Sequence, residues 1–218
     1  MTEPLTIDIW SDVACPWCYI GKRHLEQGLA ALGADAPDVR IEYHSFELAP
    51  DTPVDFAGSE VDFLVGAKGL PRDRVLQMLD RVTAVAADAG LTYDFGRLQH
   101  TKTLKAHELL HFAKEQGRQL ELEERLFAAY FTEGAHVGRA DELVRLAEEA
   151  GLDGAAARQA LDSGRYADAV QEDIEQARQL GISGVPFFVL DGKYGISGAQ
   201  PPEVFAQALN QVAAERAA

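Results

Sequence analysis

Cysteine is scarce in this sequence, whose 218 residues contain only Cys15 and Cys18. Two cysteines cannot build the disulfide framework of a small secreted fold. They also cannot supply the four thiolates of a structural zinc site made from two CxxC pairs. In a reducing cytoplasm a lone CxxC pair is more often redox-active than structural, so it is the first candidate for chemistry. The alternative is two small core residues that share this spacing by coincidence.

Positive charge and long apolar runs are also in short supply. Lys and Arg number 20 against 35 Asp and Glu, which gives a formal net charge of −15. No positive field would attract polyanions, so we expect neither nucleic acid nor an anionic membrane as a partner. No apolar run reaches the roughly 18 residues that a membrane-spanning helix needs. The first ten residues, MTEPLTIDIW, do not resemble a secretory signal, and we therefore expect a cytoplasmic protein.

The two ends of the chain have the patterns of a sheet. Alternating apolar residues predict strands over residues 5–10 and 39–48, with a helix from Cys15 to about Leu32 between them. Near the other end, residues 185–190 (VPFFVL) predict a strand that an Asp-Gly hairpin turn joins to another over 193–197. A final amphipathic helix is expected from Pro202.

The middle of the chain is nearly all helical in pattern. Helical periodicity covers residues 59–68, 71–89, 103–116, 120–132, 140–150, 154–161 and 165–180. Sheet-forming ends separated by helices predict an α/β fold with a large all-helical insertion. We expect residues 1–58 and 165–218 to form the two parts of the sheet domain, with residues 59–164 as the insertion.

The CPWC motif lies where the first strand turns into a helix. Backbone amides and the positive end of the helix dipole favour a thiolate at such a place. An ordinary thiol has a pKa of about 8.5, so a catalyst working near neutral pH needs such help. We expect Cys15 to attack a disulfide and form a mixed disulfide, and the more shielded Cys18 to release the product by attacking Cys15. Trp17, between the thiols, is expected to be exposed and to contact substrate.

Two residues outside the motif are further candidates. Asp8, on the preceding strand, would accept a proton from Cys18 if its side chain lay beneath that thiol; the alternative is an ordinary exposed strand residue. Pro186 stands at the start of a strand, where it donates no ladder hydrogen bond. A cis Val185–Pro186 peptide would place the Val185 backbone beside Cys15, ready to pair with an extended substrate. Only about 5–6% of such bonds are cis, so the sequence leaves both isomers open.

A second motif, HExxH, is formed by His107, Glu108 and His111. On a helix both histidines would share a face and could hold zinc, with Glu108 as a general base. The longer HExxHxxGxxH pattern is not met, and nothing supports Glu123 or Glu124 as a third ligand. We therefore expect no metal site, and we expect the acidic run 121–124 to be a solvated helix face.

The residues that carry the chemistry also carry a resemblance. SDVACPWCYIGKRHLE (11–26) and GISGVPFFVLDGKYGISGAQPPEVF (181–205) resemble the DsbA-type branch of the thioredoxin-fold oxidoreductases, and more closely its cytoplasmic FrnE-like members. The segments LKAHELLHFAKEQG and LFAAYFTEGAHVG resemble that family's helical insertion, so the resemblance covers nearly the whole chain. It implies a thioredoxin fold with a large all-helical insertion.

The resemblance also implies roles for single residues. Cys15 would be the nucleophile, Cys18 the resolving thiol and Pro186 the cis proline. Substrate would contact Pro16, Trp17, Val185 and Pro186. Asp8 is implied only weakly, because the acidic residue of DsbA proteins lies one position closer to the motif. Pro16-Trp17 lacks the histidine of strongly oxidising relatives, which implies a less oxidising potential than theirs.

The implied function is a thiol–disulfide oxidoreductase that acts as a reductase, oxidase or isomerase. Its partners would be protein or small-molecule disulfides and dithiols. No bound cofactor is expected, but glutathione would be a possible redox partner. The sequence leaves open whether the protein forms a homodimer. A neighbouring branch, which resembles hydroxychromene-carboxylate isomerases and kappa-class glutathione transferases, has a serine or a single thiol at the Cys15 position. A glutathione-dependent transferase or isomerase is therefore one alternative, and a redox-inert peptide-binding module is another.

Overall fold

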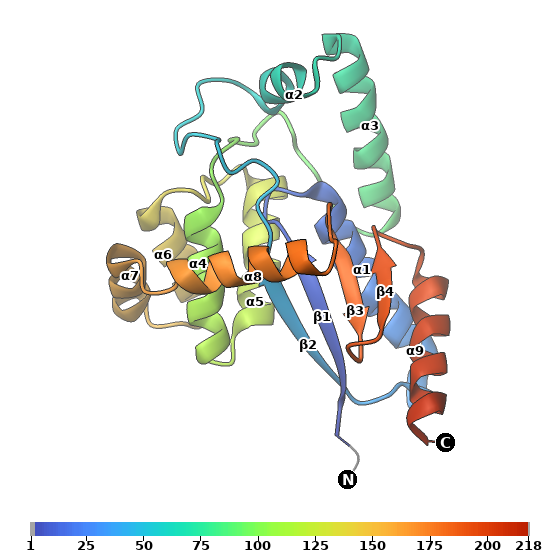
Figure 1. The fold of residues 1–218 in the computed structure, drawn as a ribbon. Helices are drawn as coiled ribbons and strands as arrows, with labels where there is room; N and C mark the ends of the chain where they lie inside the picture. The colour runs from blue at the N-terminus through green and yellow to red at the C-terminus, as the bar shows by residue number, and fades with distance from the viewer. Residues whose placement is uncertain (1–2, 218) are drawn as a thin grey trace.

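A computed structural model describes residues 3–217 of the chain. A mixed sheet forms its centre, with strands β1 (Leu5–Ser11), β2 (Val39–Ser45), β3 (Phe187–Leu190) and β4 (Tyr194–Ser197). The strand order is β2-β1-β3-β4, in which β1 and β2 are parallel and the other neighbours antiparallel. The last strands thus return to lie beside the first, as Figure 1 shows.

Helices make up most of the rest. The α-helices are α1 (Pro16–Leu32), α2 (Glu60–Lys68), α3 (Arg72–Asp88), α4 (Leu104–Glu115), α5 (Gln119–Ala128), α6 (Ala140–Glu149), α7 (Gly154–Ser163), α8 (Ala167–Gln179) and α9 (Pro202–Ala217). A 3-10 turn (Gly33–Asp35) follows α1, and a π-helical turn (Ala129–Glu133) follows α5. No helix within residues 3–217 combines the length and the apolarity needed to cross a membrane.

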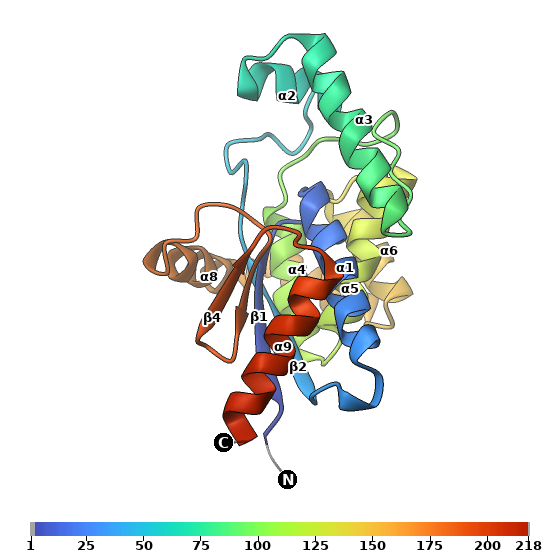
Figure 2. The same cartoon turned by 90° about the vertical axis from the view of Figure 1, so that its right-hand side faces the viewer.

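Helices cover both faces of the sheet, and Figure 2 shows α8 on one side with α1 and α9 on the other. On the α1 and α9 side, Ile7 and Ile9 of β1 pack with Phe205 of α9. On the opposite side, Trp10 packs with Ala177 of α8. Successive residues of a strand face opposite sides of the sheet. Alternate residues of β1 therefore belong to the two different layers.

The helices between β2 and α8 pack around a core of their own. Leu109, Leu126 and Phe127 are fully buried there, and the same core contains Cys15 and Cys18. The α2–α3 pair lies at the end of the sheet where α1 begins (Figure 1), and Val82 and Ala86 of α3 join the same core. The CPWC motif is therefore packed against the helical block as well as the sheet.

The elements follow the sequence expectations closely, with three main differences. The strand expected over 185–190 begins only at Phe187, so Val185 and Pro186 precede it. The strand expected to reach residue 48 ends at Ser45, because the Leu48 amide donates to Asp12 Oδ2 at 2.7 Å instead of pairing in the sheet. The helix expected over 120–132 changes to a π-helical turn after Ala128.

Candidate active site

The CPWC motif begins helix α1. Cys15 occupies the N-cap position with extended backbone angles (φ −90°, ψ 111°), and Pro16 is in the first turn. Proline suits this position because the first amides of a helix have no partner within the helix. The Cys15 amide donates to the Asp12 carbonyl at 2.9 Å, which closes the turn between β1 and α1. Cys15 therefore lies at the positive end of a helix of 17 residues.

The far end of the chain lies directly beside Cys15. Cys15 Sγ is 3.5 Å from the Val185 carbonyl oxygen, across 170 residues of sequence, and the Val185–Pro186 peptide bond is cis. The pairing of Trp10 with Phe187 between β1 and β3 holds this segment in place. Gly21 permits the close approach of α1, because a Cβ there would lie 2.9 Å from Pro186 Cγ.

A groove of about 660 Å³ opens at Cys15. Its lining includes Cys15, Pro16, Trp17 and Val185, and the α2–α3 pair forms another wall with Phe63, Leu64, Met78, Leu79 and Val82. Trp17 is 40% exposed, as expected from the sequence. The predicted substrate contacts are Pro16, Trp17, Val185 and Pro186, and all but Pro186 line this groove. The shape and apolar walls suit a substrate that extends away from the thiol.

The two thiols are not equivalent. Both are free and buried, with 3% of Cys15 and 2% of Cys18 exposed, but only Cys15 lines the groove. Burial, and next the adjacent Cys15 sulfur, raise the pKa of Cys18 well above its ordinary value. If one of the two thiols is ionised, the negative charge is therefore less favourable on Cys18 than it would be on an ordinary thiol. The arrangement keeps a protonated thiol behind a sulfur that faces the groove.

Asp8 is not placed beneath the thiols. Its carboxylate lies 3.0 Å from His44 Nε2, and His44 in turn stacks on Trp10, on the α8 side of the sheet. Because residues of a strand alternate, Asp8 faces away from Ile7 and Ile9, which pack toward α1. The conditional role of Asp8 as proton acceptor to Cys18 therefore has no support in the geometry.

Glu123 of α5 is a buried carboxylate bonded to the strand that leads into the motif. It is 1% exposed, so the expectation of a solvated face over 121–124 is wrong at this residue. Its Oε1 accepts a hydrogen bond from Ser11 Oγ at 3.2 Å, and Ser11 precedes the turn to the motif. Burial raises the pKa of Glu123 to about 7, although neighbouring His107 and Ser11 lower it.

A sequence signal for Glu123 exists. The buried residues of α5 are Gln119, Leu122, Glu123, Leu126 and Phe127, which are spaced as one face of a helix. A glutamate within that apolar series is a candidate for burial, whereas Glu121 lies off it.

The HExxH residues are buried but point to different partners. His107 Nε2 lies 3.4 Å from Asp12 Oδ1, while His111 Nε2 lies 3.0 Å from Asp173 Oδ2. Glu108 pairs with Lys105 at 2.9 Å. The motif therefore joins α4 to the turn after β1 and to α8.

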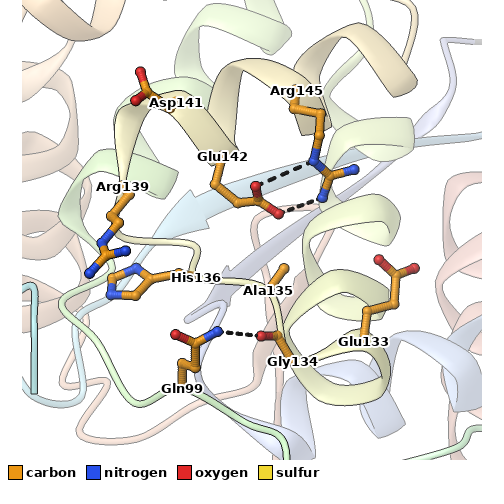
Figure 3. A pocket seen from close by; sticks show the side chains of 9 residues that line it. All are labelled: Gln99, Glu133, Gly134, Ala135, His136, Arg139, Asp141, Glu142 and Arg145. Carbon is orange, nitrogen blue, oxygen red and sulfur yellow. Dashed lines mark hydrogen bonds and ion pairs between the residues drawn. The ribbon is translucent and has the colours of Figure 1, made fainter. Parts of the chain in front are cut away.

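A second hollow, of about 550 Å³, shares no lining residue with the groove (Figure 3). Its charged residues are largely paired within the chain: Arg145 binds Glu142, and Arg139 binds Asp55. Gln99 donates to the Gly134 carbonyl at 2.7 Å. This surface presents no arrangement of reactive groups.

Comparison with known proteins agrees with this architecture. The uncharacterised protein YwbO of Bacillus subtilis (strain 168) is 31% identical over 206 residues, which is 94% of this chain and 95% of that protein. The probable DsbA oxidoreductase SCO1869 from Streptomyces coelicolor matches with a TM-score of 0.90 and 42% identity, covering 97% of this chain and 91% of that one.

A more distant structure shares the fold alone. The cytosolic disulfide reductase DsbM from Pseudomonas aeruginosa, solved with GSH, has a TM-score of 0.66 at 18% identity and covers 95% of this chain and 99% of its own. The family model of the DSBA-like thioredoxin domain matches residues 6–210. The chain, with its thioredoxin fold and helical insertion, therefore belongs to the DSBA-like thioredoxin domain family.

Proposed function

We propose that this protein is a thiol–disulfide oxidoreductase that works through a mixed disulfide on Cys15. The observation that carries the proposal is the asymmetry of the two thiols. Cys15 lines the groove beside the Val185 carbonyl, whereas Cys18 lies behind it and holds its proton more tightly than an ordinary thiol. One sulfur is thus placed to meet substrate, and the other is protected until it is needed.

The proposed cycle has two exchange steps. The Cys15 thiolate attacks a substrate disulfide, so that one substrate sulfur leaves as a thiolate and the other becomes bound to Cys15. Cys18 then loses its proton and attacks Cys15, which forms the Cys15–Cys18 disulfide and releases the second substrate thiol. The reverse sequence oxidises a dithiol, so the redox poise of the partner sets the direction.

The groove favours a disulfide carried on an extended chain. Apolar side chains such as Phe63 and Leu79 line the α2–α3 wall, and the Val185 backbone lies at the opposite side of Cys15. We propose protein disulfides as the main substrates, in the cytoplasm, with glutathione as a small-thiol redox partner. The fold shared with a cytosolic reductase solved with GSH supports that environment and that partner.

Insulin reduction with a dithiol reductant tests this function. Cys15→Ser should abolish turnover, because no nucleophile remains in the groove. Cys18→Ser should accumulate the mixed disulfide, which mass spectrometry detects as an adduct on Cys15. Ser163→Ala, on the remote helix α7, is the control and should turn over like the wild type. Full activity of Cys15→Ser would reject the mechanism.

One observation favours a second candidate, a glutathione-dependent transferase or isomerase. Lys68 and Arg81 line the groove of this strongly acidic chain and would suit the carboxylates of glutathione. Titration of glutathione into Cys18→Ser by calorimetry separates the two. Saturable binding, together with transfer or isomerisation that survives without Cys18, would favour the second candidate. Loss of all activity without Cys18 would favour the first.

A further inference from the structure

Glu123 combines deep burial with an incomplete set of hydrogen bonds. Its Oε1 accepts from Ser11, but its Oε2 is buried without a hydrogen-bond partner within the described residues. A buried carboxylate oxygen without a partner is costly, because a charge there has lost its hydration. Such a residue lowers the stability of the folded protein, and its bond to Ser11, on the strand that leads into the CPWC motif, points to a role in the chemistry.

Ser11 connects this carboxylate to Cys18. The Ser11 hydroxyl donates to Glu123 Oε1 at 3.2 Å, and the same side chain is a close polar neighbour of Cys18. Ser11 lies on the strand face that points to α1, unlike Asp8, whose carboxylate bonds to His44. A hydroxyl both donates and accepts, so it can pass one proton on while it takes another.

We propose that Glu123, a residue of the helical insertion, accepts the Cys18 proton through the Ser11 hydroxyl when Cys18 attacks the mixed disulfide. The inference rests on the proposed function, and it moves the proton acceptor from the strand, where sequence reasoning looked for it, to helix α5. Glu123 acts through Ser11 and touches no substrate. Its role is to receive a proton, and it forms no bond to sulfur.

The step balances in atoms and charge. Cys18 gives its proton to Ser11, and Ser11 gives its own hydroxyl proton to the Glu123 carboxylate. The Cys18 sulfur forms a bond to Cys15, the bond between Cys15 and the substrate sulfur breaks, and the substrate leaves as a thiolate. Two thiol groups of the enzyme become one disulfide, and the substrate disulfide becomes two thiols. No reactant beyond those of the proposed function is required.

The surroundings of Glu123 suit a group that changes charge. The ionisable groups that face it are Asp12, Lys22 of α1, Tyr43 and His44 of β2, and His107 and His111 of α4. His107 and Lys22 stabilise the carboxylate, whereas burial and Asp12 favour the protonated acid. The balance gives Glu123 a pKa of about 7, so near neutral pH both forms are accessible.

An aromatic disulfide with a coloured thiol product, dithiobis(nitrobenzoate), separates the two steps in stopped flow. The first release of coloured thiol reports the attack by Cys15, and the second reports the attack by Cys18. We expect Glu123→Gln to leave the first phase unchanged and to slow the second by about 100-fold near neutral pH. Ser11→Ala, which keeps the acid but removes the connection, should slow the second phase as well.

The pH profile gives a readout that a structural role would not change. In the wild type the second phase should rise with pH as Glu123 loses its proton near pH 7. That rise should disappear in Glu123→Gln and return in part in Glu123→Asp. Glu124→Gln is the matched control, because Glu124 is the next residue on α5 and binds Lys22 and Tyr19 rather than Ser11.

The outcomes are distinct. A wild type that never releases the second thiol would reject the proposed function itself. A normal second phase in Glu123→Gln, or an equal loss in Glu124→Gln, would overturn the role of Glu123 and leave the dithiol mechanism standing. If Glu123→Gln did not fold, a wild-type second phase with no rise near pH 7 would be enough to reject the inference.

Discussion

The imidazole of His44 is held between two carboxylates. Its Nδ1 lies 3.0 Å from Asp173 of α8, and its Nε2 lies 3.0 Å from Asp8 of β1. Burial lowers the pKa of His44, but the hydrogen bonds to Asp173 and Asp8 outweigh it and raise the pKa to about 9. Burial raises the pKa of Asp173, but hydrogen bonds with His111 and then His44 outweigh it and hold that pKa well below its usual range. Strand and helix are thus joined by a buried charged pair.

This pair predicts a pH dependence of stability. An unfolded histidine titrates near 6.5, so the folded state binds the proton more tightly between about pH 6.5 and 9. The contribution is complete below pH 6.5 and is lost as the pH rises through 9. The stability difference between wild type and His44→Gln, from urea unfolding, should fall by roughly 2–3 kcal/mol between pH 6 and 9.5. A difference that did not change with pH would contradict this.

Glu123 predicts the opposite kind of effect. Its folded pKa of about 7 exceeds the ordinary 4.5, so the folded state favours the protonated acid and stability falls as the pH rises from 4.5 to 7. Glu123→Gln should therefore be more stable than the wild type above pH 7, by roughly 1–3 kcal/mol, and no more stable below pH 4.5. Thermal unfolding at both pH values checks this, and a variant that is less stable at pH 8 would contradict it.

The sequence predicts the redox pair better than its surroundings. Cys15, Cys18 and the Val185–Pro186 segment follow from one short motif and one distant proline, and the structure brings Cys15 and Val185 together. The contact of Glu123 with Ser11 could not be predicted in the same way. It depends on how α5 packs against the sheet, and it joins residues 112 positions apart.

Helix α1 makes two close approaches through its glycines. A Cβ at Gly28 would lie 2.7 Å from the Pro202 carbonyl oxygen and 2.9 Å from Phe205 Cβ, where α1 crosses α9. A Cβ at Gly21 would instead press on Pro186. The same added methyl group would therefore disturb α1 at its contact with α9 in one case and beside Pro186 in the other.

This pair of glycines gives a matched test. Gly28→Ala should cost roughly 1–3 kcal/mol of unfolding free energy, because rigid backbone opposes the methyl, and should leave thiol exchange intact. Gly21→Ala should also slow the first phase of disulfide exchange, because Pro186 and the Val185 carbonyl must shift. Denaturant unfolding and stopped-flow exchange on both variants check this, and equal kinetics in the two would contradict it.

Element types were readable from periodicity, while their arrangement was not. Ile7 and Ile9 predict β1, and the Asp191-Gly192 turn predicts the hairpin of β3 and β4. Nothing local specifies that β3 pairs with β1 instead of β2. Strand order depends on which distant segments are buried against each other. The alternation of apolar and polar residues along a strand does not specify that order.

The insertion contributes to the whole molecule in two places. Its α2–α3 pair lines the groove on one side of the motif, and its α5 supplies the buried carboxylate on the other. The core of the helical block also includes both cysteines. Without these helices the sheet and its flanking helices would lack the α2–α3 wall of the groove and the partner of Ser11.

The distance of 170 residues between Cys15 and Val185 has a consequence for protein synthesis. The ribosome makes both thiols well before Val185, so a nascent chain carries the pair long before its proline segment has emerged. A polypeptide stalled or cleaved before residue 185 would keep two sulfurs without the backbone that lies beside Cys15. The surroundings of Cys15 are therefore completed only after the segment around Val185 has been made.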